Sequence, residues 1–344
     1  MTVPSQPGAT VLGATVPGAI GKRDFLTIDD LSAEELAALL DSADALKADR
    51  RRSAGRAALR EDLSGMSVGM IFEKPSTRTR VSFEVAIREL GGGPVVLSAT
   101  ELQLGRGETV EDTARVLSRF LHALVVRTFA QSRLETLAAA AGTIPVINAL
   151  SDSAHPCQAL ADLQTIRERR GTLAGLKLAY LGDGNNVAAS LLRAGAKTGM
   201  HVAIGAPTGY GPAPDVVAAA RAGAEALGAG GSITVTTDPL EAAADADVLY
   251  TDVWASMGQE AEHAARVQVF GPYQVGADAL RAAKGDALVL HCLPAHRGEE
   301  ITAEAIDGPN SAVWDQAENR LHAQKALLLF LLAPHDAPAA GSAR

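Results

Sequence analysis

Residues 68–90 read VGMIFEKPSTRTRVSFEVAIREL and contain the strand, turn and helix that decide the fold. The apolar run Val68–Phe72 predicts a buried strand, and Thr79–Leu90 has the apolar spacing of a helix. Pro75 disfavours helix at the residue before it, and Ser76 is placed to cap the helix that follows. A strand that leads at once into a helix is the repeating element of parallel α/β sheets.

The same turn gathers hydroxyl and guanidinium donors in the segment Ser76-Thr77-Arg78-Thr79-Arg80. The first N–H groups of a helix and its dipole favour bound anions, and arginine adds a two-pronged hydrogen-bond donor. A capped helix with two solvated arginines is the simpler interpretation of any one of these residues. The density of donors within five residues instead favours a site for a phosphate group.

Strands alternate with helices on both sides of this turn. The first series of expected strands is Val68–Phe72, Val95–Ser98, Ala123–Thr128 and Ile144–Asn148, and the second is Leu178–Leu181, Val202–Ile204, Ile233–Thr236, Val248–Thr251 and Leu288–His291. Expected helices between them are Thr79–Leu90, Val110–Phe120, Leu134–Ala141, Gln158–Arg169, Ala188–Thr198, Asp215–Leu227 and Ala261–Val269. The pattern predicts an α/β protein of two domains, each a parallel sheet flanked by helices, with the active site in the cleft between them.

The length of 344 residues suits two domains better than one. We expect the first domain at residues 21–150 and the second at residues 151–318. A last helix at 319–332 is expected to pack back on the first domain. Residues 1–20 have no apolar periodicity and are expected to form a mobile arm, and residues 334–344 a flexible tail.

Composition excludes several classes of partner. The chain carries 31 basic and 40 acidic residues, a net charge of -9, which argues against binding to nucleic acid or to an anionic membrane. Its longest apolar run, Ala326–Ala333, is shorter than the roughly 20 residues that span a bilayer. With two cysteines, no disulfide framework and no targeting signal, the chain is predicted to be cytoplasmic.

Further polar residues follow expected strands, namely Arg127, His155 and the pair His291-Cys292. Each alone is typical of a surface charge, a helix cap or a buried cysteine. Their shared position at the carboxyl edge of a sheet favours convergence on one cleft. No nucleophile-elbow pattern surrounds Cys292, and two distant cysteines without a Cys-x-x-Cys or His-x-x-x-His pattern predict no metal site.

The segment Gly182-Asp183-Gly184 follows a strand, as in a dinucleotide-binding turn. The third glycine position is Val187, however, and no acidic residue ends the next strand, so a dehydrogenase is disfavoured. The turn still offers Asn185 and Asn186 to a ligand. Asp252, at the end of another strand, is placed to accept an ammonium group, and Ser256 to meet a carboxylate, although a hydrated loop is the simpler interpretation of that segment.

Together these segments resemble the aspartate/ornithine carbamoyltransferase family from about Phe25 to Leu332. Ser76–Arg80 resembles the family's carbamoyl-phosphate loop, and HPCQALAD, residues 155–162, its second signature. Residues 252–258 (DVWASMG) and His291-Cys292-Leu293-Pro294 are similar to the branch that uses ornithine.

The resemblance implies that the first domain binds carbamoyl phosphate and the second ornithine. The implied reaction transfers the carbamoyl group to the δ-amine of L-ornithine and yields L-citrulline and phosphate, as in arginine biosynthesis, without a cofactor. It also implies a homotrimer or a multiple of trimers. A related enzyme that uses putrescine or a modified ornithine, and a two-lobed binding protein without activity, remain alternatives at this stage.

The resemblance also implies individual residue roles. Those for carbamoyl phosphate are Ser76, Thr77, Arg78, Thr79, Gln103, Arg127, His155, Gln158, Cys292, Leu293 and Arg320. Those for ornithine are Asn186, Asp252, Ser256 and Met257. Arg127, His155 and Cys292 are the implied catalytic residues, with Cys292 beside the δ-amine and not in a covalent intermediate.

Overall fold

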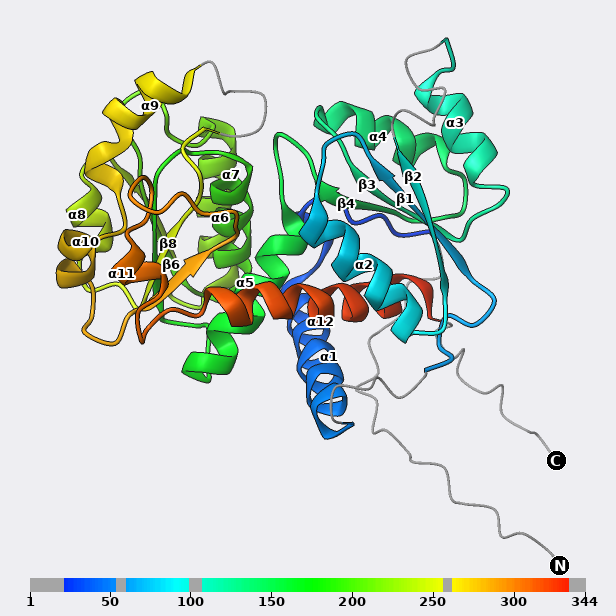
Figure 1. Ribbon diagram of the computed structural model, residues 1–344, viewed down its shortest axis with the longest axis horizontal. Helices are drawn as coiled ribbons and strands as arrows, with labels where there is room; N and C mark the ends of the chain where they lie inside the picture. The colour runs from blue at the N-terminus through cyan, green and yellow to red at the C-terminus, as the bar shows by residue number, and fades with distance from the viewer. Residues whose placement is uncertain (1–21, 54–59, 99–106, 256–261, 334–344) are drawn as a thin grey trace, which may run out of the picture.

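The computed structural model describes residues 22–53, 60–98, 107–255 and 262–333. It has two lobes, each built on a parallel sheet with helices packed against it (Figure 1). The predicted α/β class with two parallel sheets is therefore confirmed. No helix among the described residues is both long enough and apolar enough to cross a bilayer.

The first lobe contains a four-stranded sheet in the order β2-β1-β3-β4. Its strands are β1 (Ser67–Phe72), β2 (Gly93–Ser98), β3 (Ala123–Arg127) and β4 (Val146–Leu150), and its helices are α2 (Thr77–Glu89), α3 (Val110–Leu117) and α4 (Gln131–Ala140). The chain moves from β1 to β2 on one side and to β3 and β4 on the other. The connections therefore diverge between β1 and β3, where α/β sheets open a crevice for ligands.

The second lobe contains a five-stranded sheet in the order β7-β6-β5-β8-β9. Its strands are β5 (Lys177–Leu181), β6 (His201–Gly205), β7 (Ser232–Thr236), β8 (Val248–Thr251) and β9 (Leu288–His291). Its helices are α6 (Asn186–Thr198), α7 (Pro214–Leu227), α8 (Pro239–Ala243), α9 (His263–Phe270), α10 (Ala277–Ala282) and α11 (Ala303–Ile306). Here the connections diverge between β5 and β8. The sequence did not predict α8, α10 or α11, because so few turns show no readable apolar period.

Three long helices join the lobes, namely α1 (Ala33–Arg52), α5 (Pro156–Arg170) and α12 (Val313–Leu332). Figure 1 shows α12, in red, running beneath both lobes with α5 next to it, and α12 packs against α5, α1 and α2. Helix α12 begins six residues before the predicted start at Asn319. Ser32 caps α1 in a reciprocal capping box with Glu35.

A buried polar junction lies where these three helices meet. Lys47 of α1 donates to Glu168 of α5 at 2.8 Å and to Asn319 of α12 at 2.6 Å. Asn319 in turn donates to Thr165 at 2.9 Å. Since the Lys47 side chain is only 2% exposed, its charge depends on these partners for compensation.

We expect Lys47→Met to lower the free energy of unfolding by about 3 kcal/mol, because it leaves Glu168 and Asn319 without their cationic partner. Arg51→Ala is the matched control. Its side chain is 63% exposed and lies 3.9 Å from Glu318, so its loss should cost less than about 0.5 kcal/mol. Urea unfolding of both variants measures the difference, and equal effects would show that the junction does not stabilise the fold.

Candidate functional site

A cleft of about 1310 Å³ lies between the lobes at the carboxyl ends of both sheets. Eight of the predicted carbamoyl-phosphate residues line it, namely Ser76, Thr77, Arg78, Arg127, His155, Cys292, Leu293 and Arg320. Two of the predicted ornithine residues, Asn186 and Asp252, also line it. The structure thus brings together residues that are up to 244 positions apart, from Ser76 to Arg320.

Two predicted residues, Thr79 and Gln158, are buried behind the cleft and do not line it. The Thr79 hydroxyl accepts a hydrogen bond from Arg320 at 2.7 Å, and the Gln158 amide donates to Asp162 at 2.8 Å. In this structure both therefore contact residues of the protein. Three other predicted residues, Gln103, Ser256 and Met257, lie outside the described part of the chain.

The turn between β1 and α2 forms one wall of the cleft. Ser76 has extended backbone angles and its hydroxyl accepts from the N–H of Thr79 at 3.3 Å, so it is the N-cap that the sequence predicts. The first turn of α2 has no acidic residue, which leaves the positive end of the helix dipole uncompensated. Arg80 is exposed, lies 4.0 Å from Glu84 and is not part of the lining.

Arginines concentrate positive charge behind this turn. Burial, together with the positive charge of Arg320, lowers the pKa of Arg127 to about 10, so Arg127 stays charged at neutral pH. Arg127 also lies at a shift in register between β3 and β4, a bulge of the kind that redirects a side chain at a strand end. Burial likewise lowers the pKa of Arg320. The result is a desolvated, cationic wall that suits an anionic ligand.

His155 is a neutral imidazole in this setting. Burial and the charges of Arg320 and Arg127 lower its pKa well below the usual value. Its backbone N–H donates to Ser190 at 2.8 Å, while its Nδ1 atom has no hydrogen-bond partner among the described residues. A neutral histidine with an unused ring nitrogen is available to contact a polar ligand in the cleft.

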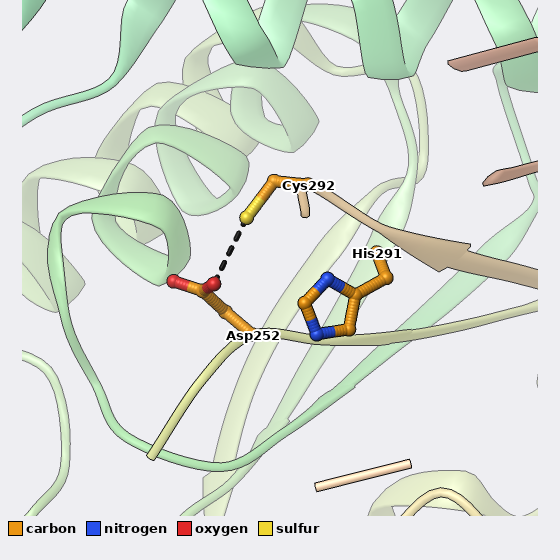
Figure 2. A group of neighbouring side chains, drawn as sticks. All are labelled: Asp252, His291 and Cys292. Carbon is orange, nitrogen blue, oxygen red and sulfur yellow. Dashed lines mark hydrogen bonds between the residues drawn. The ribbon is translucent and has the colours of Figure 1, made fainter. Parts of the chain in front are cut away.

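Asp252 and Cys292 face each other from the ends of β8 and β9 (Figure 2). The Cys292 thiol donates to Asp252 Oδ1 at 2.9 Å, and the Asn185 amide donates to Oδ2 at 3.0 Å. Burial and the adjacent Asp252 carboxylate raise the pKa of Cys292 well above its usual value. The group is therefore a thiol at neutral pH, which is a weak nucleophile.

The residue after Cys292 has an unusual backbone. Leu293 has a φ of 59°, which is uncommon for a leucine, and its N–H donates to His291 Nδ1 at 2.9 Å. Such conformations persist where the surroundings hold them, often at ligand sites. The turn brings the backbone of Leu293 to the edge of the cleft.

The Gly-x-Gly pattern at residues 182–184 is explained by close packing of the turn after β5, and it does not require a bound dinucleotide. A Cβ atom on Gly184 would lie 2.1 Å from the backbone nitrogen of Pro212, so only glycine fits. Asn185 caps α6 through the N–H of Val187 at 2.9 Å. Asn186 donates to the Ser151 carbonyl at 2.6 Å and so links the turn to the segment after β4.

Two comparisons of the sequence with protein-family models decide the family. Residues 23–168 match the carbamoyl-P binding domain of aspartate/ornithine carbamoyltransferases, and residues 174–331 match their Asp/Orn binding domain. The chain belongs to the aspartate/ornithine carbamoyltransferase family. The boundary between the two matches falls at the end of α5.

Individual family members are similar over nearly their whole length. An ornithine carbamoyltransferase of Parafrankia sp. (strain EAN1pec) is 62% identical over 312 residues, which cover 90% of this chain and 96% of the relative. The solved ornithine carbamoyltransferase of Pyrococcus furiosus is 51% identical with a TM-score of 0.86, covering 92% of this chain and 98% of that one. The Gloeobacter violaceus enzyme is 50% identical with a TM-score of 0.79, over 91% and 99% of the two chains.

Two further residues that line the cleft, Lys74 and Arg266, were not predicted from the sequence. Lys74 is buried, forms an ion pair with Asp152 and lies 4.3 Å from the ring centre of Phe129. Its position just before the donor-rich segment Ser76–Arg80 could have indicated that Lys74 lines the site. Arg266 of α9 pairs with Asp183 at 2.8 Å, and no local pattern around it indicated a cleft residue.

The pKa of Asp162, beneath the cleft, yields a prediction on stability. Burial raises it to about 7, despite hydrogen bonds from Gln158 and Gln316, whereas an unfolded aspartate titrates near about 3.9. The folded state thus binds the proton more tightly, and this stabilisation is lost as pH rises from about 4 to about 7. Relative to the wild type, Asp162→Asn should gain stability over this range, by at most about 4 kcal/mol.

Asp286→Asn is a control whose stability difference from the wild type should stay nearly constant from pH 5 to pH 7. The hydrogen bond from Arg170 lowers the pKa of the exposed Asp286, so its contribution is lost as pH falls and not as pH rises. Urea unfolding at pH 4, 5, 6 and 7 measures both series. A constant difference between the wild type and Asp162→Asn across this range would contradict a raised pKa at Asp162.

Proposed function

We propose that the chain transfers the carbamoyl group of carbamoyl phosphate to the δ-amine of L-ornithine, yielding L-citrulline and phosphate. The observation that carries the proposal is one cleft with a cationic wall on one side and the Asp252–Cys292 pair on the other. Relatives that are 54–62% identical are named ornithine carbamoyltransferase, which supports this assignment.

The α2 turn supplies the phosphate site in this proposal. Ser76, Thr77 and Arg78 offer hydroxyl, backbone N–H and guanidinium donors at the start of a helix. Arg127 and Arg320 lie close enough for each to influence the pKa of its neighbours, so they extend the positive field towards the centre of the cleft. Thr79 acts indirectly, because its hydroxyl positions Arg320.

The reaction needs positioning and charge stabilisation. The neutral δ-amine attacks the carbonyl carbon, a C–N bond forms, and the carbonyl oxygen gains negative charge in a tetrahedral intermediate. The bond from that carbon to the phosphate oxygen then breaks, and the surplus amine proton leaves with phosphate or solvent. Fixed donors in a water-poor cleft, here the arginines and His155, stabilise the charge that develops on both oxygens.

Asp252 anchors the ammonium group of the amino-acid substrate in this proposal. Its two oxygens each accept one hydrogen bond already, and each retains capacity for another donor. Asn186 lies on the same side of the cleft. Ser256 and Met257 complete the ornithine site by resemblance to the family.

The assembly and setting of the enzyme are part of the proposal. Resemblance to the family supports a homotrimer or a multiple of trimers, a place in arginine biosynthesis and a cytoplasmic location. The net charge of -9 supports the absence of nucleic-acid and membrane partners.

Arg78→Ala should lower kcat/KM for citrulline formation at least about 100-fold, because it removes a charged donor from the phosphate site. Arg80→Ala is the matched control, since this exposed arginine lies two residues away and outside the cleft lining, and it should change the rate by no more than about twofold. A colorimetric citrulline assay with ornithine and carbamoyl phosphate measures both. Equal activity of Arg78→Ala and the wild type would refute the proposed site.

The same assay tests the acceptor. Ornithine and putrescine are compared side by side with the wild-type chain, and ornithine should react while putrescine should not, because putrescine lacks the α-carboxylate that Ser256 is expected to contact. Product formed from putrescine and not from ornithine would reassign the substrate.

The pH dependence of the rate distinguishes a mechanism in which Cys292 acts as a thiol from one in which it acts as a thiolate nucleophile. The pKa of His155 is lowered well below its usual value and that of Cys292 is raised well above its usual value, so neither group should titrate near neutral pH. The rate should therefore rise with pH as the ornithine δ-amine loses its proton, and the rise should persist in Cys292→Ser. That variant retains a hydrogen-bond donor for Asp252 and should keep measurable activity. A loss as large as that of a missing covalent nucleophile would contradict this role.

A further inference from the structure

A second cluster of polar side chains lies at the edge of the cleft, separate from the residues of the proposed reaction. Three residues, His296, Glu299 and Glu300, have donor atoms within 4.8 Å of one another, and His263 contacts Glu299 at 3.0 Å; we call these four residues the His–Glu cluster. His263 is the first residue of α9, while the other three belong to the segment between β9 and α11. Both histidines line the cleft, with side chains 44% and 48% exposed.

Glu300 is the unusual member of the cluster, because its side chain is completely buried. Its Oε1 atom accepts from the backbone N–H of His296 and lies 3.2 Å from Nε2 of His291. Its Oε2 atom has no hydrogen-bond partner among the described residues and lies 3.6 Å from Nδ1 of His296. A buried carboxylate oxygen without a donor is costly, so a positively charged partner is expected there.

No lysine or arginine among the described residues fills this role. Neither Glu299 nor Glu300 has a salt bridge with a lysine or arginine in the part of the chain that the structure describes. The nearby arginines are paired elsewhere, Arg266 with Asp183 and Arg297 with Asp307 at 2.8 Å each.

The spacing of the donor atoms matches a small tetrahedral ion. Ligands about 2.0 Å from zinc at tetrahedral angles lie about 3.3 Å from one another. The pairs His263 Nε2–Glu299 Oε2, His296 Nδ1–Glu300 Oε2 and His296 Nδ1–Glu299 Oε2 are 3.0, 3.6 and 4.0 Å apart. The donor atoms of His296, Glu299 and Glu300 all lie within 4.8 Å of one another, and His263, which contacts Glu299, would become the fourth ligand by a rotation of its exposed side chain.

We propose that the His–Glu cluster binds one divalent transition-metal ion of the zinc type. Two imidazoles and two carboxylates are a ligand set for zinc or its neighbours, and not for magnesium or calcium, which prefer oxygen alone. The ion would join the start of α9 to the segment after β9, two parts of the cleft wall. The sequence predicted no metal because its cysteine and histidine spacing is unsuitable, and these ligands meet only through the fold.

Asp252, His291 and Cys292 form a competing cluster with donor atoms equally close together (Figure 2). The potential ligand atoms of His291 and Asp252 in this cluster already take part in hydrogen bonds within the protein. His291 uses one ring nitrogen for Leu293 and the other for Glu300, and both oxygens of Asp252 accept hydrogen bonds. The raised pKa of the Cys292 thiol further opposes metal binding, which requires the thiolate.

Zinc binding by the full-length chain tests the proposal. The protein is treated with a chelator, which is then removed, and it is titrated with Zn²⁺ against a chromophoric zinc indicator. We expect one ion per chain for the wild type and affinity at least about tenfold weaker for His263→Ala, His296→Ala and Glu299→Gln. His201→Ala is the matched control, because this partly exposed histidine contacts Ser232 on neighbouring β7 and should bind like the wild type. Unchanged affinity in His263→Ala/His296→Ala would overturn the proposal.

Cobalt spectroscopy separates the two clusters. Co²⁺ bound by imidazole and carboxylate gives visible d–d bands without the near-ultraviolet charge-transfer band of a thiolate ligand. We expect this spectrum from the wild type and an identical one from Cys292→Ser. A thiolate band that disappears in Cys292→Ser would overturn the assignment and place the ion at Cys292. Neither measurement depends on citrulline formation. A negative result for the metal site would therefore leave the proposed function unaffected, and a negative citrulline assay would leave the metal site unaffected.

Discussion

The hydrogen bond from Arg320 to the Thr79 hydroxyl joins the last helix of the chain to the turn that begins α2. On the adjacent residue, Asn319 is held by Lys47 of α1 and bonds Thr165 of α5. One turn of α12 therefore positions a buried arginine at the cleft and also locks the helices that connect the two lobes. The geometry of the cleft depends on this junction, because each sheet contributes only one of its walls.

Electrostatics divides the cleft into two halves. The α2 turn, Arg127 and Arg320 make one half cationic, and their charge together with burial keeps His155 neutral. On the other half, Asp252 and burial keep Cys292 protonated. The arrangement suits a reaction in which an anionic leaving group and a cationic amino acid meet at one carbon. It uses fixed charges and not a covalent nucleophile, which agrees with the functional proposal.

Parts of the candidate site could be predicted from the sequence because they depend on residues that are close together in the chain. The N-cap at Ser76 and the strand-end positions of Arg127 and Asp252 follow from patterns within a few residues. Other features could not be predicted from the sequence. Thr79 and Gln158 lie behind the cleft because tertiary partners, Arg320 and Asp162, occupy their polar groups. Short helices such as α8 and α10 escaped detection because five or six residues show no apolar period.

The sequence by itself determined the alternation of strands and helices, the anion-binding turn and the resemblance to a family, because each resides in contiguous residues whose conformational preferences act locally. Only the tertiary structure decided which of these segments share a cleft. It also decided which carboxylates are neutralised and which, like Glu300, retain an unpaired buried oxygen. The physical reason is that burial and long-range pairing set pKa values and ligand geometry, and both arise from contacts between residues far apart in the chain.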